Sequence, residues 1–309
     1  MTEATAIISS SACPICGAEG DKVSDHIRGN KPCAVYHCEI CTLGYLDRNW
    51  VQRDEFAFYN SVYIEELKPE KRFNMPEKLQ DTRATFVRAR TGNDTSLLEI
   101  GPGSGLFLER IRDHVATVQG CELNTVEATY IETELGIPCF NGHVDDMPED
   151  QKFDAICAYQ VFEHIAEPHS FLQELRKRLN PGGQLFIEVP NYLDPLYDLY
   201  KIQKFRDGFF FPEQHPLVYS PQALQKVMQE NGFGHVKTNL LQTYSISNHM
   251  NWMYTNSGND SFQAGIDISL PNMPDEEWRK IWEPVNTLYC KLLEDAGHGD
   301  VIFSVFELN

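Results

Sequence analysis

The sequence is short of positive charge. It has 26 Lys and Arg residues against 45 Asp and Glu residues, so its 309 residues carry a formal net charge of −19. Binding to a nucleic acid depends on clustered positive charge, and so does binding to an anionic membrane surface. No run of basic residues offers such a patch, so we expect neither a nucleic acid nor a membrane as a partner.

Long apolar runs are missing as well. No uninterrupted apolar segment reaches the length of a membrane-spanning helix. The first residues, MTEATAIISSSACP, have neither the positive start nor the apolar core of a signal peptide. We therefore expect a cytoplasmic protein, whose nine cysteines are reduced and serve metal binding or chemistry rather than disulfides.

Four of the cysteines form two close pairs near the N-terminus. Cys13 and Cys16 make one C-x-x-C turn, and Cys38 and Cys41 make a second after 21 intervening residues. Each turn offers two thiolates on one side, and one tetrahedral ion can join both turns, which predicts a structural zinc site with no open position. The alternative is a set of buried cysteines or a redox pair. Two residues between the pairs are reserve ligands: Cys33 and His37.

Residues 50–92 read as a helical connector after this zinc ribbon of residues 10–49. Apolar and aromatic residues recur in it at helical spacing, and Pro69 and Pro76 interrupt it. Such helices pack a ribbon onto a main domain. The other interpretation is a lid over a substrate pocket, with Tyr59 and Tyr63 facing that pocket.

Residues 93–309 show the alternation of strands and helices that is typical of an α/β domain. The predicted strands are 96–100, 117–122, 152–159, 183–190, 235–241 and 300–308, and the predicted helices are 106–112, 125–135, 167–180 and 220–233. This order predicts a mainly parallel sheet with helices on both faces, which binds ligands at the carboxyl ends of its strands. Residues 191–219 look irregular, and residues 242–299 form a long insertion on the substrate side.

The first strand of this domain leads into a glycine turn, LLEIGPGSG. Gly101, Gly103 and Gly105 alternate, and Leu106 stands where a dinucleotide fingerprint would have its third glycine. Glu99 ends the strand beside the turn. A pyrophosphate there would face this carboxylate at a cost of about 1 kcal/mol per pair of charges at 4 Å even in water. S-adenosylmethionine (SAM) carries an ammonium and a sulfonium instead, so the turn favours SAM over NAD.

The ordered series LLEIGPGSG, CELN, DDMP, FDAICAYQVFEHI and LNPGGQLFIEVPN resembles the class I SAM-dependent methyltransferases, and within them the ubiquinone-biosynthesis type. The resemblance covers residues 95–309. It implies a Rossmann-like, mainly parallel seven-stranded sheet with an antiparallel last strand.

The resemblance also assigns cofactor-binding residues. The methionine portion of SAM would lie on Glu99, Gly101, Gly103 and Gly105, and the ribose on Glu122 and Leu123. Asp146 and Met147 would flank the adenine, and Tyr159 and Gln160 would lie near the sulfur. Glu163 and His164 read as polar residues at the start of a helix.

The pairing of a cysteine ribbon with this domain is similar to the sugar C-methyltransferases of deoxysugar pathways. In that family a segment with two histidines and a glutamate supplies the base. Here FFFPEQHPLVYS places His215 at the last histidine and Gln214 at the glutamate. His215 is therefore the candidate base, because an imidazole accepts a proton at neutral pH. His249 is the alternative base, and the candidate substrate contacts are Asn191, Glu213, Tyr219, Asn248 and Trp252.

The expected function is thus methyl transfer from SAM to a small molecule, first of all a sugar or nucleotide-linked sugar. A quinone, a phenol or another natural-product hydroxyl is the alternative acceptor. A different class of function is also open, namely a non-catalytic SAM-binding scaffold or regulatory protein that docks through its ribbon. The sequence leaves open whether carbon, oxygen or nitrogen receives the methyl group.

Overall fold

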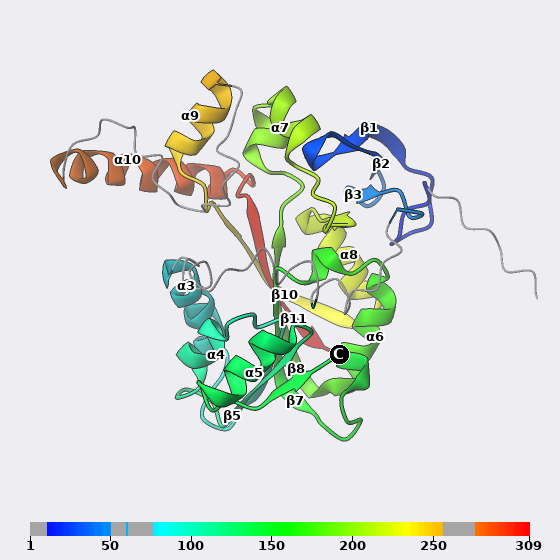
Figure 1. Ribbon diagram of the computed structural model, residues 1–309, viewed down its shortest axis with the longest axis vertical. Coiled ribbons are helices and arrows are strands. Elements are labelled where there is room, and N and C mark those ends of the chain that lie inside the picture. The colour runs from blue at the N-terminus through cyan, green and yellow to red at the C-terminus, as the bar shows by residue number, and fades with distance from the viewer. Residues whose placement is uncertain (1–10, 51–59, 61–76, 256–275) are drawn as a thin grey trace, which may run out of the picture.

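The computed structural model describes residues 11–50, 60, 77–255 and 276–309. In these residues the chain forms a seven-stranded sheet and, at one end of the molecule, a separate four-stranded sheet (Figure 1). Tyr59 and Tyr63 lie outside the described residues, so the lid expected over a substrate pocket stays a prediction. None of the described helices is long and apolar enough to span a membrane.

The large sheet has the strand order β10-β11-β8-β7-β4-β5-β6. Its strands are β4 (Ser96–Ile100), β5 (Thr117–Glu122), β6 (Cys139–Asn141), β7 (Phe153–Tyr159), β8 (Leu179–Pro190), β10 (Phe233–Leu241) and β11 (Val301–Leu308). Strands β4 to β8 are parallel, and β11 runs antiparallel to both of its neighbours. The predicted mainly parallel sheet with an antiparallel last strand is therefore confirmed.

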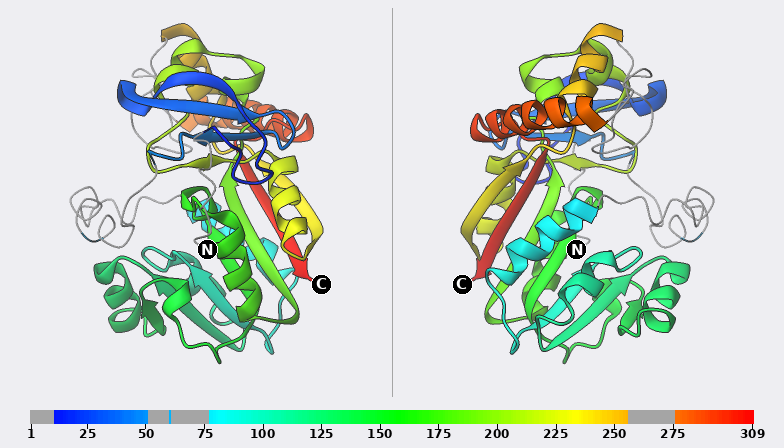
Figure 2. Two further views of the ribbon diagram at one scale, coloured as in Figure 1. Left: turned by 90° about the vertical axis from the view of Figure 1, so that its right-hand side faces the viewer. Right: turned by 90° about the vertical axis from the view of Figure 1, so that its left-hand side faces the viewer.

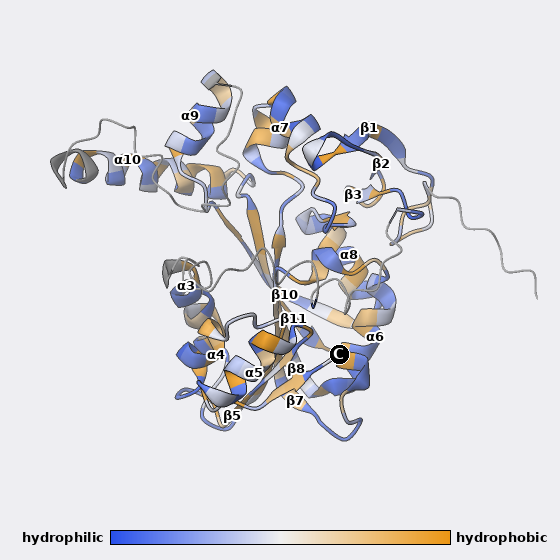
Figure 3. Ribbon diagram, in the orientation of Figure 1, coloured by the Kyte–Doolittle hydropathy of each residue, from blue (hydrophilic) through white to orange (hydrophobic). Residues whose placement is uncertain are grey.

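Helices cover both faces of this sheet, because successive strand residues point to opposite faces and both sets are apolar (Figures 2 and 3). Leu97 of β4 packs in the cluster under α3 (Glu77–Arg88), α4 (Leu106–Ile111) and α5 (Thr125–Thr133). Leu98, one residue later, packs under α6 (Pro168–Arg178) and α8 (Pro221–Glu230) on the other face. The carboxyl ends of the parallel strands lie together at one edge of the sheet.

Strand β8 begins earlier than expected. Helix α6 ends at Arg178, before the Pro-Gly-Gly sequence, but β8 already pairs with β7 at Leu179. Phe153 pairs with Leu179 and Ala155 pairs with Gln184, so residues 180–183 form an irregularity inside the strand. The Pro-Gly-Gly sequence stops the helix and makes a bulge rather than a loop.

The small sheet joins the N-terminal ribbon to the main domain. Its strands are β1 (Asp21–Ile27), β2 (Lys31–Cys38), β3 (Leu43–Leu46) and β9 (Leu217–Val218). The first three come from the ribbon, whereas β9 lies in the segment that was expected to be irregular. Gly44 pairs with Val218, and the amide of Leu46 donates to the carbonyl of Pro216 at 2.9 Å. The ribbon therefore fixes the backbone around His215.

Aromatic residues fill the contact between the ribbon and the segment after β8. That segment contains a π-helix (Pro195–Leu199) and α7 (Gln203–Gly208). Its buried aromatic side chains cluster with ribbon residues, among them Tyr192, Tyr197, Phe205, Phe210 and Phe211 with Ile27 and Val35. The insertion adds α9 (Ile246–Thr255) and α10 (Glu276–Asp295), which lie at the end of the large sheet where its parallel strands have their carboxyl ends (Figure 1).

Candidate functional site

The glycine turn after β4 is built in a conformation that few other residues adopt. Gly101, Gly103 and Gly105 have φ angles of 65°, 54° and 74°. A Cβ on Gly101 would lie 2.7 Å from Val161, and one on Gly105 would lie 2.7 Å from Leu135. A Cβ on Gly103 would meet no atom of the described residues within 4 Å. The turn is therefore packed against Val161 and Leu135 on one side, and the described residues leave space at Gly103.

Among the described residues, buried carboxylates around this turn outnumber the buried positive charges. Glu99, Glu122 and Glu188 are at most 7% exposed, and Arg83 of α3 is 4% exposed. Arg83 donates to both carboxylate oxygens of Glu188, through Nε at 2.8 Å and through Nη2. One guanidinium thus offsets one of three carboxylates. The site favours a ligand with positive charge and opposes a phosphate.

Glu99 is the least satisfied member of the group. Its Oε2 atom is buried and has no hydrogen-bond partner among the described residues. Burial raises the pKa of Glu99 to about 8, and the neighbouring carboxylates of Glu122 and Glu188 add to the rise while Arg83 opposes it. An ammonium group beside Glu99 would give this oxygen a donor and stabilise its charged form.

Glu122 ends β5 and faces the turn. Its Oε2 accepts from the amide of Gly103 at 3.0 Å, and its Oε1 accepts from the amide of Asn124 at 2.8 Å. Next to it, the carbonyl of Leu123 accepts from Nδ2 of Asn60 at 2.8 Å. Asn60 belongs to the connector, and no local sequence pattern marked it. The connector thus reaches the edge of the sheet where Glu122 lies.

The expected adenine residues follow β6. Asp146 is exposed in a short 3-10 helix, whereas the side chain of Met147 is 2% exposed and packs in the apolar core. Arg178 holds this loop by donating to the carbonyls of Met147 and Pro148 at 3.0 Å each. The loop is therefore rigidly connected to α6.

Tyr159 and Gln160 end β7. The Tyr159 ring lies edge-on to Phe107 at 4.9 Å and beneath the guanidinium of Arg83 at 4.7 Å, so its side chain belongs to the core. Its hydroxyl has no hydrogen-bond partner in the described part of the chain. Gln160 has a φ of 56° and donates from Nε2 to Glu188 at 3.1 Å. Both residues thus gather around the Arg83–Glu188 ion pair.

The structure brings His215 next to Glu163 and His164, which the sequence pattern predicts to be polar residues at the start of a helix. Glu163, His164 and His215 have donor atoms within 4.8 Å of one another, and the two imidazole rings lie 4.7 Å apart. Such a set can share a proton or hold a divalent cation. The sequence signal for this set is an acidic residue and a histidine four and five residues after a buried strand.

Glu163 is the unexpected member of this set. It is fully buried, and neither carboxylate oxygen has a hydrogen-bond partner among the described residues. Burial raises the pKa of Glu163 to about 8. Burial and the neighbouring His164 lower the pKa of His215 well below its usual 6.5, so its imidazole is neutral at pH 7. The hydroxyl of Tyr219 is buried close by and also lacks a partner in the described residues.

His249, the alternative base, is held inside a hydrogen-bonded network. It is 0% exposed; Nδ1 lies 2.5 Å from the hydroxyl of Tyr289, and Nε2 lies 3.3 Å from Nε2 of Gln242. The Tyr289 hydroxyl in turn contacts the Tyr200 hydroxyl at 3.0 Å. Burial lowers the pKa of His249 to about 4. Both ring nitrogens have protein partners, so the geometry favours His215 over His249 as a base.

The expected substrate contacts divide into two groups. Asn191 is fully buried and donates to the carbonyl of Gly299 at 2.6 Å, and Trp252 packs between Phe205 and Phe209. Glu213 forms an exposed ion pair with Lys31 of the ribbon. These three residues hold the scaffold together. In contrast, Oδ1 of Asn248 and the hydroxyl of Tyr219 are buried polar atoms without a described partner.

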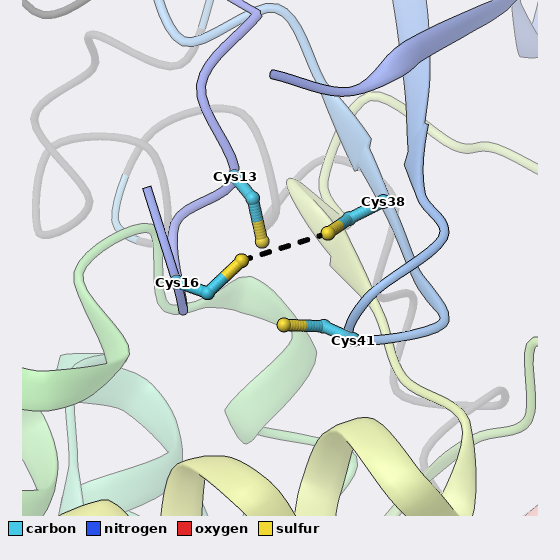
Figure 4. A group of neighbouring side chains, drawn as sticks. All are labelled: Cys13, Cys16, Cys38 and Cys41. Atoms are coloured by element: carbon cyan, nitrogen blue, oxygen red, sulfur yellow. Dashed lines mark hydrogen bonds between the residues drawn. The ribbon is translucent and has the colours of Figure 1, made fainter. Parts of the chain in front are cut away.

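The four ribbon cysteines point toward one another (Figure 4). All four Sγ atoms lie within 4.8 Å of one another, and those of Cys16 and Cys38 are 3.7 Å apart. A tetrahedral Zn²⁺ with bonds of about 2.3 Å separates its sulfurs by about 3.8 Å, so the group fits such an ion. Burial raises the pKa of Cys13 to about 12, so its thiolate needs a neighbouring cation.

The reserve ligands lie apart from this group. Cys33 packs in the aromatic cluster, where its Sγ donates to the carbonyl of Ala34 at 3.5 Å. The ring of His37 stacks on Tyr192 at 4.9 Å. Neither belongs to the set of four donors.

This sheet order and glycine turn define the fold of a class I SAM-dependent methyltransferase. Residues 71–238 match the family model described as "Methyltransferase domain", and the chain belongs to that family. The resemblance expected from the sequence is thereby confirmed. A SAM-dependent methyltransferase from Archaeoglobus fulgidus shares the fold with a TM-score of 0.51 and 17% identity, over 80% of this chain and 100% of that one.

Two curated relatives are named ubiquinone biosynthesis O-methyltransferase. The one from Parvibaculum lavamentivorans is 28% identical over 163 residues, which are 47% of this chain and 64% of the relative. The one from Maricaulis maris is 27% identical over 164 residues, which are 47% of this chain and 65% of the relative. The match thus spans less than two thirds of either relative.

We predict that Glu163→Gln changes how stability depends on pH. The pKa of Glu163 is about 8 when folded and near 4.5 when unfolded, so its neutral form stabilises the fold at low pH. That contribution is full below about pH 4.5 and is lost as the pH rises through about 8. Urea unfolding should therefore show the variant gaining stability relative to the parent as the pH rises. Glu149→Gln, an exposed control, should keep the parent's profile; a parallel profile for Glu163→Gln would contradict the prediction.

Proposed function

We propose that the protein transfers a methyl group from SAM to a small-molecule acceptor. The observation that carries this proposal is the excess of buried carboxylate around the glycine turn, with Glu99 Oε2 left without a donor among the described residues. SAM brings an ammonium and a sulfonium to such a site, whereas a dinucleotide brings a pyrophosphate. Membership of the methyltransferase-domain family supports the same assignment.

The residues at the carboxyl ends of the strands fit the parts of SAM. Glu99 would accept a hydrogen bond from the ammonium, and the described residues leave space at Gly103 for the methionine portion. Glu122 would hold the ribose, and Asp146 and Met147 would border the adenine. When bound, SAM supplies an electrophilic methyl group that moves to the acceptor by in-line displacement.

His215 is the proposed base. Its imidazole is neutral at pH 7, because burial lowers its pKa, so one ring nitrogen has a lone pair that can accept the proton of an acceptor hydroxyl; the same burial makes the ring a weaker base than a free imidazole. Glu163 lies next to it and, with its pKa raised to about 8, would be a neutral hydrogen-bonding partner that orients the imidazole. Strand β9 and its pairing with β3 keep His215 at this position.

A phenol or quinol hydroxyl is the acceptor class with the most support. The two relatives described above are named for O-methylation in ubiquinone biosynthesis, and the sugar acceptor expected first has no comparable support. O-methylation of such a hydroxyl would leave the hydroxyl proton on the imidazole of His215. A non-catalytic SAM-binding scaffold is the competing function, and an assay of methyl transfer distinguishes it from an enzyme.

We also propose that the four ribbon cysteines hold a structural zinc ion. The support is the mutual distance of the sulfurs, which matches tetrahedral coordination. Four protein sulfurs complete a tetrahedral shell, so such an ion would have no position for a reactant. The ion would stabilise β2 and β3 by joining the turns at either end of the ribbon.

The first prediction from this proposal concerns cofactor binding. Calorimetric titration should give micromolar binding of SAM and S-adenosylhomocysteine and no binding of NADH. Glu99→Gln should weaken SAM binding by about tenfold or more, because a charged hydrogen bond is lost. Glu109→Gln, on the exposed side of α4, should bind like the parent. Binding of NADH alone would overturn the assignment.

The second prediction concerns the base. With radiolabelled SAM and a panel of phenols, quinols and nucleotide sugars, His215→Ala should lower kcat by about 10²–10⁴-fold and leave SAM affinity unchanged. His235→Ala, an exposed histidine of β10, is the control. A folded His215→Ala variant with full turnover would remove His215 as the base. SAM binding without turnover on any acceptor would favour the scaffold.

The third prediction concerns the metal. Protein purified without chelator should contain about one zinc ion per chain, as measured by inductively coupled plasma mass spectrometry. The Cys41→Ser variant should lose most of this zinc. Cys33→Ser is the matched control, because Cys33 lies in the aromatic cluster and should leave the zinc content unchanged. Equal loss from both variants, or no zinc in the parent, would contradict the four-cysteine site.

A further inference from the structure

The second cysteine turn, residues 38–41, is followed by a residue in an unusual conformation. Thr42 has a φ of 55°, a left-handed conformation that a β-branched residue rarely adopts. The first cysteine turn has Gly17 at the corresponding position, with a φ of 71°, and glycine carries no such strain. A strained threonine at a position suited to glycine indicates that its hydroxyl has a role.

The Thr42 hydroxyl links the second cysteine turn to helix α8. Its Oγ1 atom lies 2.6 Å from the carbonyl oxygen of Cys41 and also contacts Oγ of Ser220, which is 1% exposed. Ser220 caps α8 by accepting from the amide of Ala223 at 3.0 Å. Each hydroxyl has one proton, so Ser220 donates to Thr42, and Thr42 donates to Cys41. A chain of hydrogen bonds thus runs from the start of α8 to the second cysteine turn.

The contact between these two hydroxyls continues the pairing of β3 with β9. Gly44 of β3 pairs with Val218 of β9. This antiparallel register places Thr42 opposite Ser220, where their hydroxyls meet. His215 lies two residues before β9, at the other end of the pairing. The pairing therefore has the second cysteine turn at one end and the candidate base at the other.

The segment around Ser220 also packs against the other member of the candidate base's pair, Glu163. Tyr219, next to Ser220, is 0% exposed and stacks on Phe162 with the ring centroids 5.0 Å apart. Phe162 directly precedes Glu163 in the chain. A shift of this segment would therefore move both groups of the pair.

We propose that Thr42 is a positioning residue for the candidate base: its hydroxyl holds the segment after β9 against the second cysteine turn and so keeps His215 beside Glu163. This inference rests on the proposed role of His215 in methyl transfer. Within the described residues, the hydrogen bonds of the Thr42 hydroxyl go to Cys41 and Ser220, which are not assigned to SAM. Thr42 should therefore affect turnover and not SAM affinity, a separation that a merely structural residue would not produce.

The test variant is Thr42→Gly, which removes the hydroxyl and relieves the strain of the positive φ. Thr42→Ser, which keeps the hydroxyl, is the matched control. Thr42→Gly should keep the parent's circular dichroism spectrum, its SAM affinity and about one zinc ion per chain. Its kcat should fall by about 10–100-fold, because a small displacement of a reacting group is costly. Thr42→Ser should behave like the parent in every measurement.

Hydrogen exchange distinguishes a failure of this proposal from a failure of the proposed function. Amides of residues 215–223 should exchange at least about fivefold faster in Thr42→Gly than in the parent, with or without a known acceptor. Unchanged exchange, unchanged kcat in an active protein, equal losses in Thr42→Ser, or loss of zinc from Thr42→Gly would overturn the proposal. Faster exchange in Thr42→Gly with no methyl transfer by the parent would refute the proposed function and support the positioning of His215 by Thr42.

Discussion

The buried ion pair between Arg83 and Glu188 is the contact on which the carboxyl-end edge of the sheet depends. It joins α3 to β8 within the core, and Gln160 donates to the same carboxylate from the end of β7. Among the described residues this guanidinium pairs with only one buried carboxylate, and Glu99 keeps an oxygen without a donor beside the glycine turn. Breaking such a pair leaves a buried charge and costs several kcal/mol, so the electrostatics of the site and the stability of the sheet are linked.

The ribbon contributes to the site through backbone geometry rather than through its own chemistry. Strand β3 pairs with β9, and the amide of Arg28 donates to the carbonyl of Phe211 at 2.8 Å. The segment that carries His215 therefore folds as the edge of the ribbon's sheet. Helix–strand packing of the main domain brings Glu163 and His164 to the same place from the end of β7. The candidate base thus depends on two separately formed layers.

Several features could be predicted because their signals are local. The glycine turn needs positive φ angles, the strands before and after it are continuous apolar runs, and Ser220 caps α8 as its Ser-Pro start indicates. Other features had no local signal. The two residues of β9 become a strand only by pairing with β3, and Asn60 reaches Leu123 across 63 positions of sequence. The burial of Glu163 follows from the packing of residues 162–164 against β8 and β9, which are distant in sequence, so the local pattern indicates only a polar residue at the start of a helix.

The sequence by itself determined the alternation of strands and helices, the glycine turn with Glu99 beside it, and the pairs of cysteines. Each of these depends on backbone conformation or on spacing within about 40 residues or fewer. The tertiary structure decided which polar groups are buried without partners among the described residues and which histidine stands beside a carboxyl group. Those properties arise from contacts between distant segments, because burial and pKa depend on everything packed around a group.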